Sequence, residues 1–254
     1  KVLDNLSIGA NISYIYGDIT HSVTTAFSNS SSFSSVRLDK ISINDYKLDF
    51  GLQYSYKFNK KHVLNFGAVY SLGHSMNGKG YKYNQKWLNG ADYPSTQTGD
   101  TITNAFSLPH TFGAGLTYVY DNRLTVGADF TYQKWEDAKF YNEKNYFCNR
   151  TKIAVGAEFI PSPYSHNYLK RIRYRVGGYY SDPYTKVDGQ DGTREYGVSA
   201  GFGFPLFQSK SILNISGQYV KVSPKVKGML EENYLKINIG LTFNERWFMK
   251  WKVD

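Results

Sequence analysis

The chain has 254 residues, a net charge of +9, 23 glycines, 23 tyrosines, 16 phenylalanines and only 7 prolines. No stretch approaches 18 consecutive apolar residues, which excludes a transmembrane helix but leaves a membrane barrel open, because barrel strands give a weaker hydropathy signal. One cysteine, Cys148, excludes an intramolecular disulfide framework, and we expect a free thiol in a loop. The basic residues are not clustered on one element, which argues against nucleic-acid binding.

Apolar residues alternate with small polar residues almost from the start of the chain, so we expect an N-terminal portion that precedes Lys1 in the native protein. This period of two predicts β-strands, with apolar runs of about 9–11 residues, the length of a tilted strand that crosses a bilayer. Ten strands are expected, at 6–16, 46–58, 64–73, 112–120, 124–133, 152–159, 171–180, 195–204, 213–219 and 235–243.

The connections between these strands alternate in length. Residues 59–61, 121–123 and 208–210 predict tight turns, and 161–170 is a longer member of the same set. The other connections are predicted to be long loops, at 18–45, 74–109, 136–150, 181–194 and 221–233. Outer-membrane barrels have short periplasmic turns and long extracellular loops in this alternation.

The segment 124–133 shows how the faces are assigned. Leu124, Val126 and Phe130 lie on one face and Asp129 on the other. Elsewhere the polar face is dominated by Gly, Ser, Asn and Thr, which suits a lumen, so the apolar face is predicted to contact lipid. Aromatic residues near the strand ends predict a girdle at the membrane interfaces: Tyr16, Tyr56, Tyr120, Tyr132, Tyr180, Trp247 and Trp251.

The segment 108–140 resembles the long-chain fatty-acid transporter (FadL) family. It has an "LP" pair, a glycine-bearing strand, a tight turn, a strand with an inward Asp, and then a Trp: Leu108, Pro109, Gly113, Gly115, Asp129 and Trp135. The ten strands are similar to the last ten strands of that family's 14-strand barrel, and the ending "ERWFMKWKVD" is similar to such proteins in Bacteroidetes-type bacteria.

The resemblance implies passive uptake of hydrophobic molecules across the outer membrane of a Gram-negative bacterium, with the chain crossing it many times. In that family an N-terminal hatch plugs the barrel and a kinked early strand opens a lateral gap, and neither feature can be assigned to residues here. The family also includes barrels that serve protein-secretion complexes.

Charged residues on the predicted lumen face gather on neighbouring strands. Two interpretations are open: a salt-bridge lattice that packs the lumen, or an anion-attracting lining for a ligand such as a fatty-acid carboxylate. The candidate ligand-binding residues are Arg171, Arg173, Arg175, Asp129, Glu158 and Lys152.

Enzymatic chemistry finds little support in the sequence. The five histidines are scattered and do not have metal-ligand spacing. The pairs His74 with Asp100 and His21 with Asp18 could be imagined as catalytic, but no motif supports either pair. We therefore expect no enzyme activity, metal or cofactor.

The sequence as a whole predicts an all-β protein, an antiparallel transmembrane β-barrel over residues 1–243. Residues 244–254 are expected to continue the last strand through the periplasmic interface, or to form a periplasmic docking peptide. The leading function is passive transport of hydrophobic small molecules such as long-chain fatty acids. The alternative is a non-transporting barrel that acts as a subunit or adaptor of an outer-membrane secretion or assembly complex. The expected partners are outer-membrane lipids, a hydrophobic ligand, and other outer-membrane or periplasmic proteins.

Overall fold

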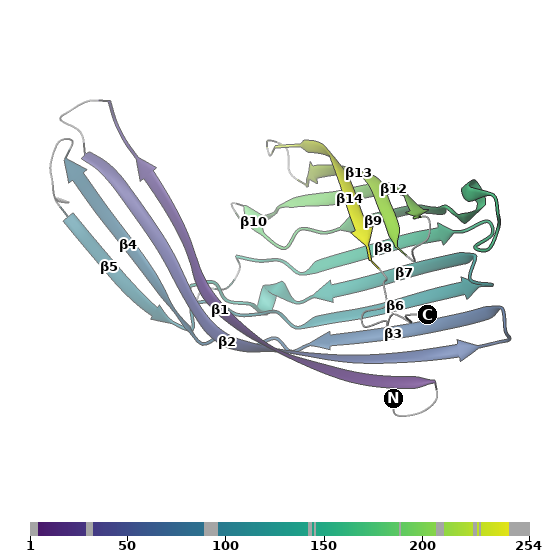
Figure 1. The fold of residues 1–254 in the computed structure, drawn as a ribbon. Helices are drawn as coiled ribbons and strands as arrows, with labels where there is room; N and C mark the ends of the chain where they lie inside the picture. Colours follow the sequence, from purple (N-terminus) through teal and green to yellow (C-terminus); the bar gives the residue numbers. More distant parts are fainter. Residues whose placement is uncertain are drawn as a thin grey trace, which may run out of the picture.

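The computed structural model describes residues 5–28, 33–88, 96–141, 144, 146–187, 189–206, 211–225, 228 and 230–243. This part of the chain is almost entirely antiparallel β-structure (Figure 1). Ten principal strands follow one another: β1 (Leu6–Thr25), β2 (Phe33–Lys57), β3 (His62–Ser71), β6 (Thr111–Tyr120), β7 (Leu124–Gln133), β8 (Arg150–Phe159), β9 (Arg173–Ser181), β12 (Thr193–Pro205), β13 (Ile212–Pro224) and β14 (Glu232–Thr242).

Each principal strand pairs antiparallel with the next one in the chain, which confirms the predicted all-β, barrel-type fold and its ten expected strands. Within the described residues the sheet is not closed on itself, because β1 pairs only with β2 and β14 only with β13. None of the helical segments described is long and apolar enough to cross a membrane. The predicted tail 244–254, with Trp247 and Trp251, lies outside the described residues.

Two of the predicted long loops are wrong. Residues 18–25 continue β1, and residues 33–45 begin β2, so that the two strands pair without interruption from Leu6 with Tyr54 to Thr25 with Ser35. The loop predicted at 74–109 contains β4 (Gly78–Leu88) and β5 (Thr96–Thr103), and β4 pairs with the first part of β2. These segments form a four-stranded sheet, ordered β1-β2-β4-β5.

We call this sheet the arm: residues 17–25 of β1, 33–43 of β2, and all of β4 and β5. Figure 1 shows that the arm extends past the ends of the other strands and bends away from their direction. The bend begins near Gly17, whose φ of 147° is a conformation that side chains disfavour. In β2 the neighbour changes from β4 at Ile43 to β3 at Asp49.

The predicted short turns agree with the structure where it describes them. Asp121 and Asn122 have φ values of 50° and 52°, the left-handed pair that a tight hairpin requires and that Asp and Asn tolerate. The turn at 208–210 lies outside the described residues. The remaining connections contain small elements: η1 (Trp135–Asp137), η2 (Tyr168–Arg171), β10 (Lys186–Val187) and β11 (Gln190–Asp191).

The two faces of the sheet differ as the alternation predicts. On β7, Phe130 is 45% exposed and Val126 is 42% exposed on the apolar face, although both are large and hydrophobic. The opposite face, carrying Asp129, is hollowed by two depressions of about 560 and 590 Å³. The small polar face is therefore the concave one, and we call it the lumen face.

A small hydrophobic core lies where the arm meets the rest of the sheet. Ile41 of the arm packs against Ala105 and Tyr141, and all three are buried. Ile43, Ile102, Phe106 and Phe140 pack around them. This core fixes the base of the arm to the connections that follow β5 and η1.

Candidate functional site

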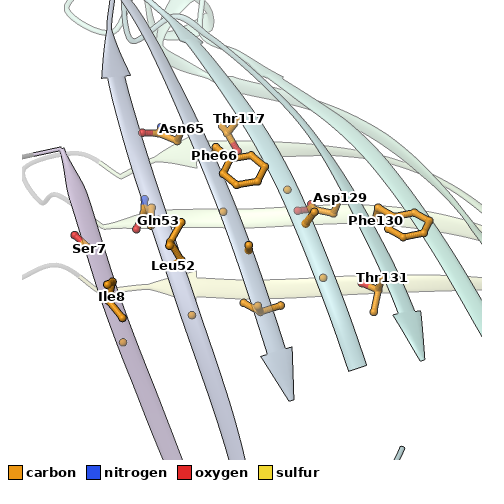
Figure 2. Close-up of a pocket in the computed structure, with 18 residues that line it drawn as sticks. Ser7, Ile8, Leu52, Gln53, Asn65, Phe66, Thr117, Asp129, Phe130 and Thr131 are labelled. Atoms are coloured by element: carbon orange, nitrogen blue, oxygen red, sulfur yellow. The ribbon is translucent and has the colours of Figure 1, made fainter. Parts of the chain in front are cut away.

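The first depression of the lumen face runs across β1, β2, β3, β6 and β7 (Figure 2). One edge of it is formed by Asp129 on β7, which is paired in register with Gly115 on β6. A Cβ at Gly115 would overlap the Asp129 carboxylate, so the glycine makes room for this side chain. The polar groups that line the depression include Ser7, Gln53, Asn65, Thr117, Asp129 and Thr131.

A charged cluster forms one wall of the second depression, at the short-turn end of β8 and β9. Arg175 donates from Nε to Glu158 Oε2 at 2.6 Å, and Arg173 donates from Nη1 to Oε1 of the same carboxylate at 3.3 Å. Glu158 and Arg175 are in register on neighbouring strands. One carboxylate thus serves two guanidinium groups, which leaves the cluster with one excess positive charge.

The cluster extends across three further strands. Arg175 also donates from Nη1 to Oδ1 of Asn214 on β13 at 2.7 Å. The intervening strand β12 has glycines here, and a Cβ at Gly203 would lie 3.3 Å from both Arg173 Cδ and Asn214 Oδ1. Asn214 in turn donates to Thr242 Oγ1 on β14 at 3.2 Å. A polar belt therefore spans β8 to β14 near the short turns.

The structure brings together three of the six predicted ligand-binding residues, namely Glu158, Arg173 and Arg175. The assignment of Arg171 to a strand is wrong, because it lies in η2 before β9 begins, with its guanidinium 5.4 Å from the centre of the Tyr168 ring. Lys152 lies six residues from Glu158 on β8, about 20 Å away, and covers the Tyr179 ring.

Sequence reasoning did not find Asn214, Gly203 or Thr242 as members of this belt. Their residue types occur on every lumen-facing strand, so composition gives no signal for them. The strand register could have found them, because Gly203 is opposite both Arg173 and Asn214. That register depends on strand ends which alternation alone places only approximately.

Three of the resemblance residues, Leu108, Pro109 and Trp135, lie at the long-loop end. Gly73 donates its backbone N–H to His110 Nδ1 at 3.2 Å, and a Cβ at Gly73 would overlap the backbone of Pro109 and His110. The Leu108–Pro109 segment therefore crosses directly over the end of β3. Trp135 packs its ring at 5.2 Å from Phe147 and 5.3 Å from Tyr184.

Cys148 lies beside the β10–β11 hairpin at the same end. Burial, and then the nearby Asp191 carboxylate, raise the pKa of the Cys148 thiol above its usual range. The Lys225 ammonium is 2.9 Å from Asp191 Oδ2, and its hydrogen bond lowers the pKa of that carboxyl. The sequence expectation of a free thiol is confirmed, and the thiol is partly buried.

The described girdle tyrosines form two groups on the apolar face. Tyr56 and Tyr120 lie beside short turns. Tyr132 and Tyr180 lie near the opposite ends of their strands, and Tyr16 lies inside β1, next to the first residue of the arm. Their exposed fractions reach 76% at Tyr16 and 46% at Tyr56. Aromatic rings at both ends of the strands match the two interfaces of a membrane.

The histidine pairs considered from sequence do not come together. His74 Nε2 lies 3.3 Å from Asp45 rather than beside Asp100, and its ring stacks on Tyr46. His21 and Asp18 are three residues apart on β1 and so face opposite sides, and Asp18 is paired with Lys40 at 2.8 Å. Across the described segments there is no group of three metal-ligating side chains.

The arm carries a third depression, of about 460 Å³, on the face that continues the lumen face. Its lining is charged and polar and includes His21, Arg37, Asp39 and Asn84. Arg37 Nε is 3.1 Å from Asp39 Oδ2. The polar surface of the lumen is thus prolonged beyond the barrel strands.

A ten-strand meander with a polar concave face and an exposed apolar face is the wall of a β-barrel of the kind found in outer membranes. The sequence model of the BamG family matches residues 1–254. The chain belongs to the BamG family. No curated protein matches its sequence.

Solved structures support the fold. A FadL homologue of Pseudomonas aeruginosa matches with a TM-score of 0.57 and 17% identity, over 89% of this chain and 57% of that one. The P. putida toluene transporter TodX matches with a TM-score of 0.52 and 16% identity, over 95% of this chain and 66% of that one. The RagAB peptide importer matches with a TM-score of 0.56 and 10% identity, over 95% of this chain and 32% of that one.

The chain therefore spans 57% of the FadL homologue and 66% of TodX. These matches confirm that the fold resembles that of FadL-type barrels. A fold of this type implies an outer-membrane location. Fatty-acid specificity and a Bacteroidetes origin stay predictions.

Proposed function

We propose that this chain is part of a barrel that acts as a subunit of an outer-membrane protein complex, with its arm as the surface that meets a partner protein. The arm is the observation that supports this proposal most directly. It consists of four paired strands that extend past the lipid-facing segments, where they add nothing to a membrane wall. Ordering this many residues costs conformational entropy, which a partner surface would offset.

The charged belt on the lumen face also supports a role other than hydrocarbon transport. Ligand sites for apolar molecules are lined mainly by hydrophobic and aromatic side chains. Here the belt of Glu158, Arg173, Arg175 and Asn214 crosses the lumen face as a connected set of polar bonds. Membership of the BamG family and the match to the RagAB peptide importer agree with association between outer-membrane proteins.

The experiment is native mass spectrometry of the full-length protein, tagged at its own gene and extracted from its own outer membrane in a mild detergent. We expect a stoichiometric assembly with other proteins. A protein found alone, carrying a small apolar adduct, would contradict the complex and favour transport.

The second candidate is passive uptake of hydrophobic small molecules such as long-chain fatty acids, through a barrel of which residues 1–243 form part. The observation that favours it is the second depression of the lumen face, of about 590 Å³, whose lining includes Arg175 and Glu158. In that case the excess positive charge of the Arg173 and Arg175 cluster attracts the carboxylate of an entering ligand.

Changing Arg173 and Arg175 together to Gln tests this second candidate. If the cluster guides an anionic ligand, uptake of a radiolabelled fatty acid should fall about tenfold, since a charge-assisted hydrogen bond contributes roughly 1.5–3 kcal/mol. Arg123→Gln, at a turn outside the cluster, is the matched control. Unchanged uptake in the double variant, with the barrel still heat-resistant on a gel, would remove the ligand-binding interpretation.

A further inference from the structure

The strand β5 ends the arm on the side opposite β1. All eight residues of β5, Thr96–Thr103, pair with residues of β4. No described residue pairs with the other side of β5. Between Thr98 and Thr103, every residue except Ile102 is exposed. One whole row of backbone donors and acceptors therefore faces water.

The direction of these groups follows from one hydrogen bond. Asn104, in register with Gly78, donates its backbone N–H to the Gly78 carbonyl at 2.8 Å. Backbone groups point to alternate sides along an antiparallel strand. The N–H groups of Gly99, Thr101 and Thr103 therefore point away from β4, and those of Asp100 and Ile102 point toward it.

Among the described residues, this edge lacks most of the features that protect sheet edges in natural proteins. Soluble proteins block a free edge with Lys, Pro, a bulge or a covering segment. The sequence of β5, TQTGDTIT, contains no Lys, Arg or Pro. Four of its eight residues are threonine, and the register with β4 is uninterrupted. Such an edge is suited to accept another strand.

The side chains of β5 indicate what that strand carries. Asp100 is the one charged residue of β5. Lys82 is opposite Asp100 on β4, and its Nζ atom lies over the Tyr141 ring, 4.6 Å from the ring centre. No ion pair of Asp100 is found in the part of the chain that the structure describes. Ile102 is on the same face, two residues further along the strand.

We propose that β5 accepts an extended segment of a partner protein as a fifth strand of the arm. The segment carries Lys or Arg opposite Asp100 and an apolar side chain beside Ile102. Main-chain hydrogen bonds to Gly99, Thr101 and Thr103 supply the affinity, and these two contacts supply the selectivity. This inference rests on the proposed function and names its docking surface.

The test uses the full-length tagged protein in its own outer membrane, with three variants. Thr101→Pro removes an outward N–H without removing a bond to β4, which proline allows only on an edge. Thr101→Val keeps that N–H and is the matched control. Asp100→Lys reverses the charge that faces the added strand. Native mass spectrometry reports the assembly, and hydrogen–deuterium exchange reports the β5 amides.

For Thr101→Pro and Asp100→Lys we expect the ratio of bound to free protein to fall roughly tenfold for one partner, the effect of losing about 1.4 kcal/mol, while Thr101→Val retains it. In the wild-type complex the amides of Gly99, Thr101 and Thr103 should exchange more slowly than in the isolated protein. An intact complex in both variants with unprotected amides would overturn the β5 inference and leave the proposed function standing. A wild-type protein that forms no complex would overturn both.

Discussion

Asp129 and Phe130 are consecutive residues of β7 that face opposite environments. Phe130 is 45% exposed on the apolar face, whereas Asp129 lines the lumen depression. Phe130→Arg should therefore destabilise the inserted barrel by about 2–4 kcal/mol if the residue lies near the midplane of the bilayer. Urea-induced unfolding in phospholipid vesicles measures this. Asp129→Asn should be much milder, and equal effects of the two changes would reverse the assignment of the faces.

Gly73 is a second residue whose effect follows from geometry. A Cβ there would lie 2.6 Å from the Pro109 carbonyl carbon, and backbone atoms cannot move aside as a flexible side chain can. Gly73→Ala should lower the free energy of unfolding by about 1–3 kcal/mol, as overpacking does. Gly67→Ala is the matched control, because a Cβ added at Gly67 in β3 would meet no other atom within 4 Å. A control as damaging as Gly73→Ala would show that the cost is not local crowding.

At the scale of the element, the β10–β11 hairpin controls the reactivity of Cys148. Burial and the Asp191 carboxylate raise the pKa of the thiol, so little reactive thiolate is present at neutral pH. Asp191→Asn removes the carboxylate and its bond to Lys225, and should increase the rate of maleimide modification several-fold at pH 7. The thiol reactivity of both proteins should rise with pH. Asp121→Asn, in a distant short turn, should leave the rate unchanged.

The strands differ in how well the sequence predicts them. Strands that separate lipid from lumen have one apolar and one polar face, so their alternation is visible, and all ten were expected. In the arm, polar and charged residues such as His21, Asp39 and Lys40 occur on both faces, so alternation disappears. The polar composition of 18–45 and 74–109 is therefore typical of loops, although residues 18–25, 33–45, 78–88 and 96–103 pair as strands.

The candidate site was predictable only in part for a related reason. Glu158, Arg173 and Arg175 carry formal charges on adjacent lumen-facing strands, which marked them at once. Arg171 follows the same spacing but lies in η2, because the strand begins two residues later than the alternation indicated. Asn214 depends on a glycine in the strand between, a relation that exists only once strand order and register are known.

At the scale of the whole molecule, the arm and the barrel strands should separate as structural units. The barrel strands obtain their stability from their own ladders, such as β3 with β6, whereas the arm meets the connections through Ile41, Ala105 and Tyr141. Replacing 18–42 and 79–103 by short glycine-containing turns should therefore leave insertion and heat resistance on a gel intact. The complex should lose the partner that the arm holds, which native mass spectrometry measures. A shortened protein that keeps every partner would show that docking occurs on the barrel itself, because no arm surface would remain.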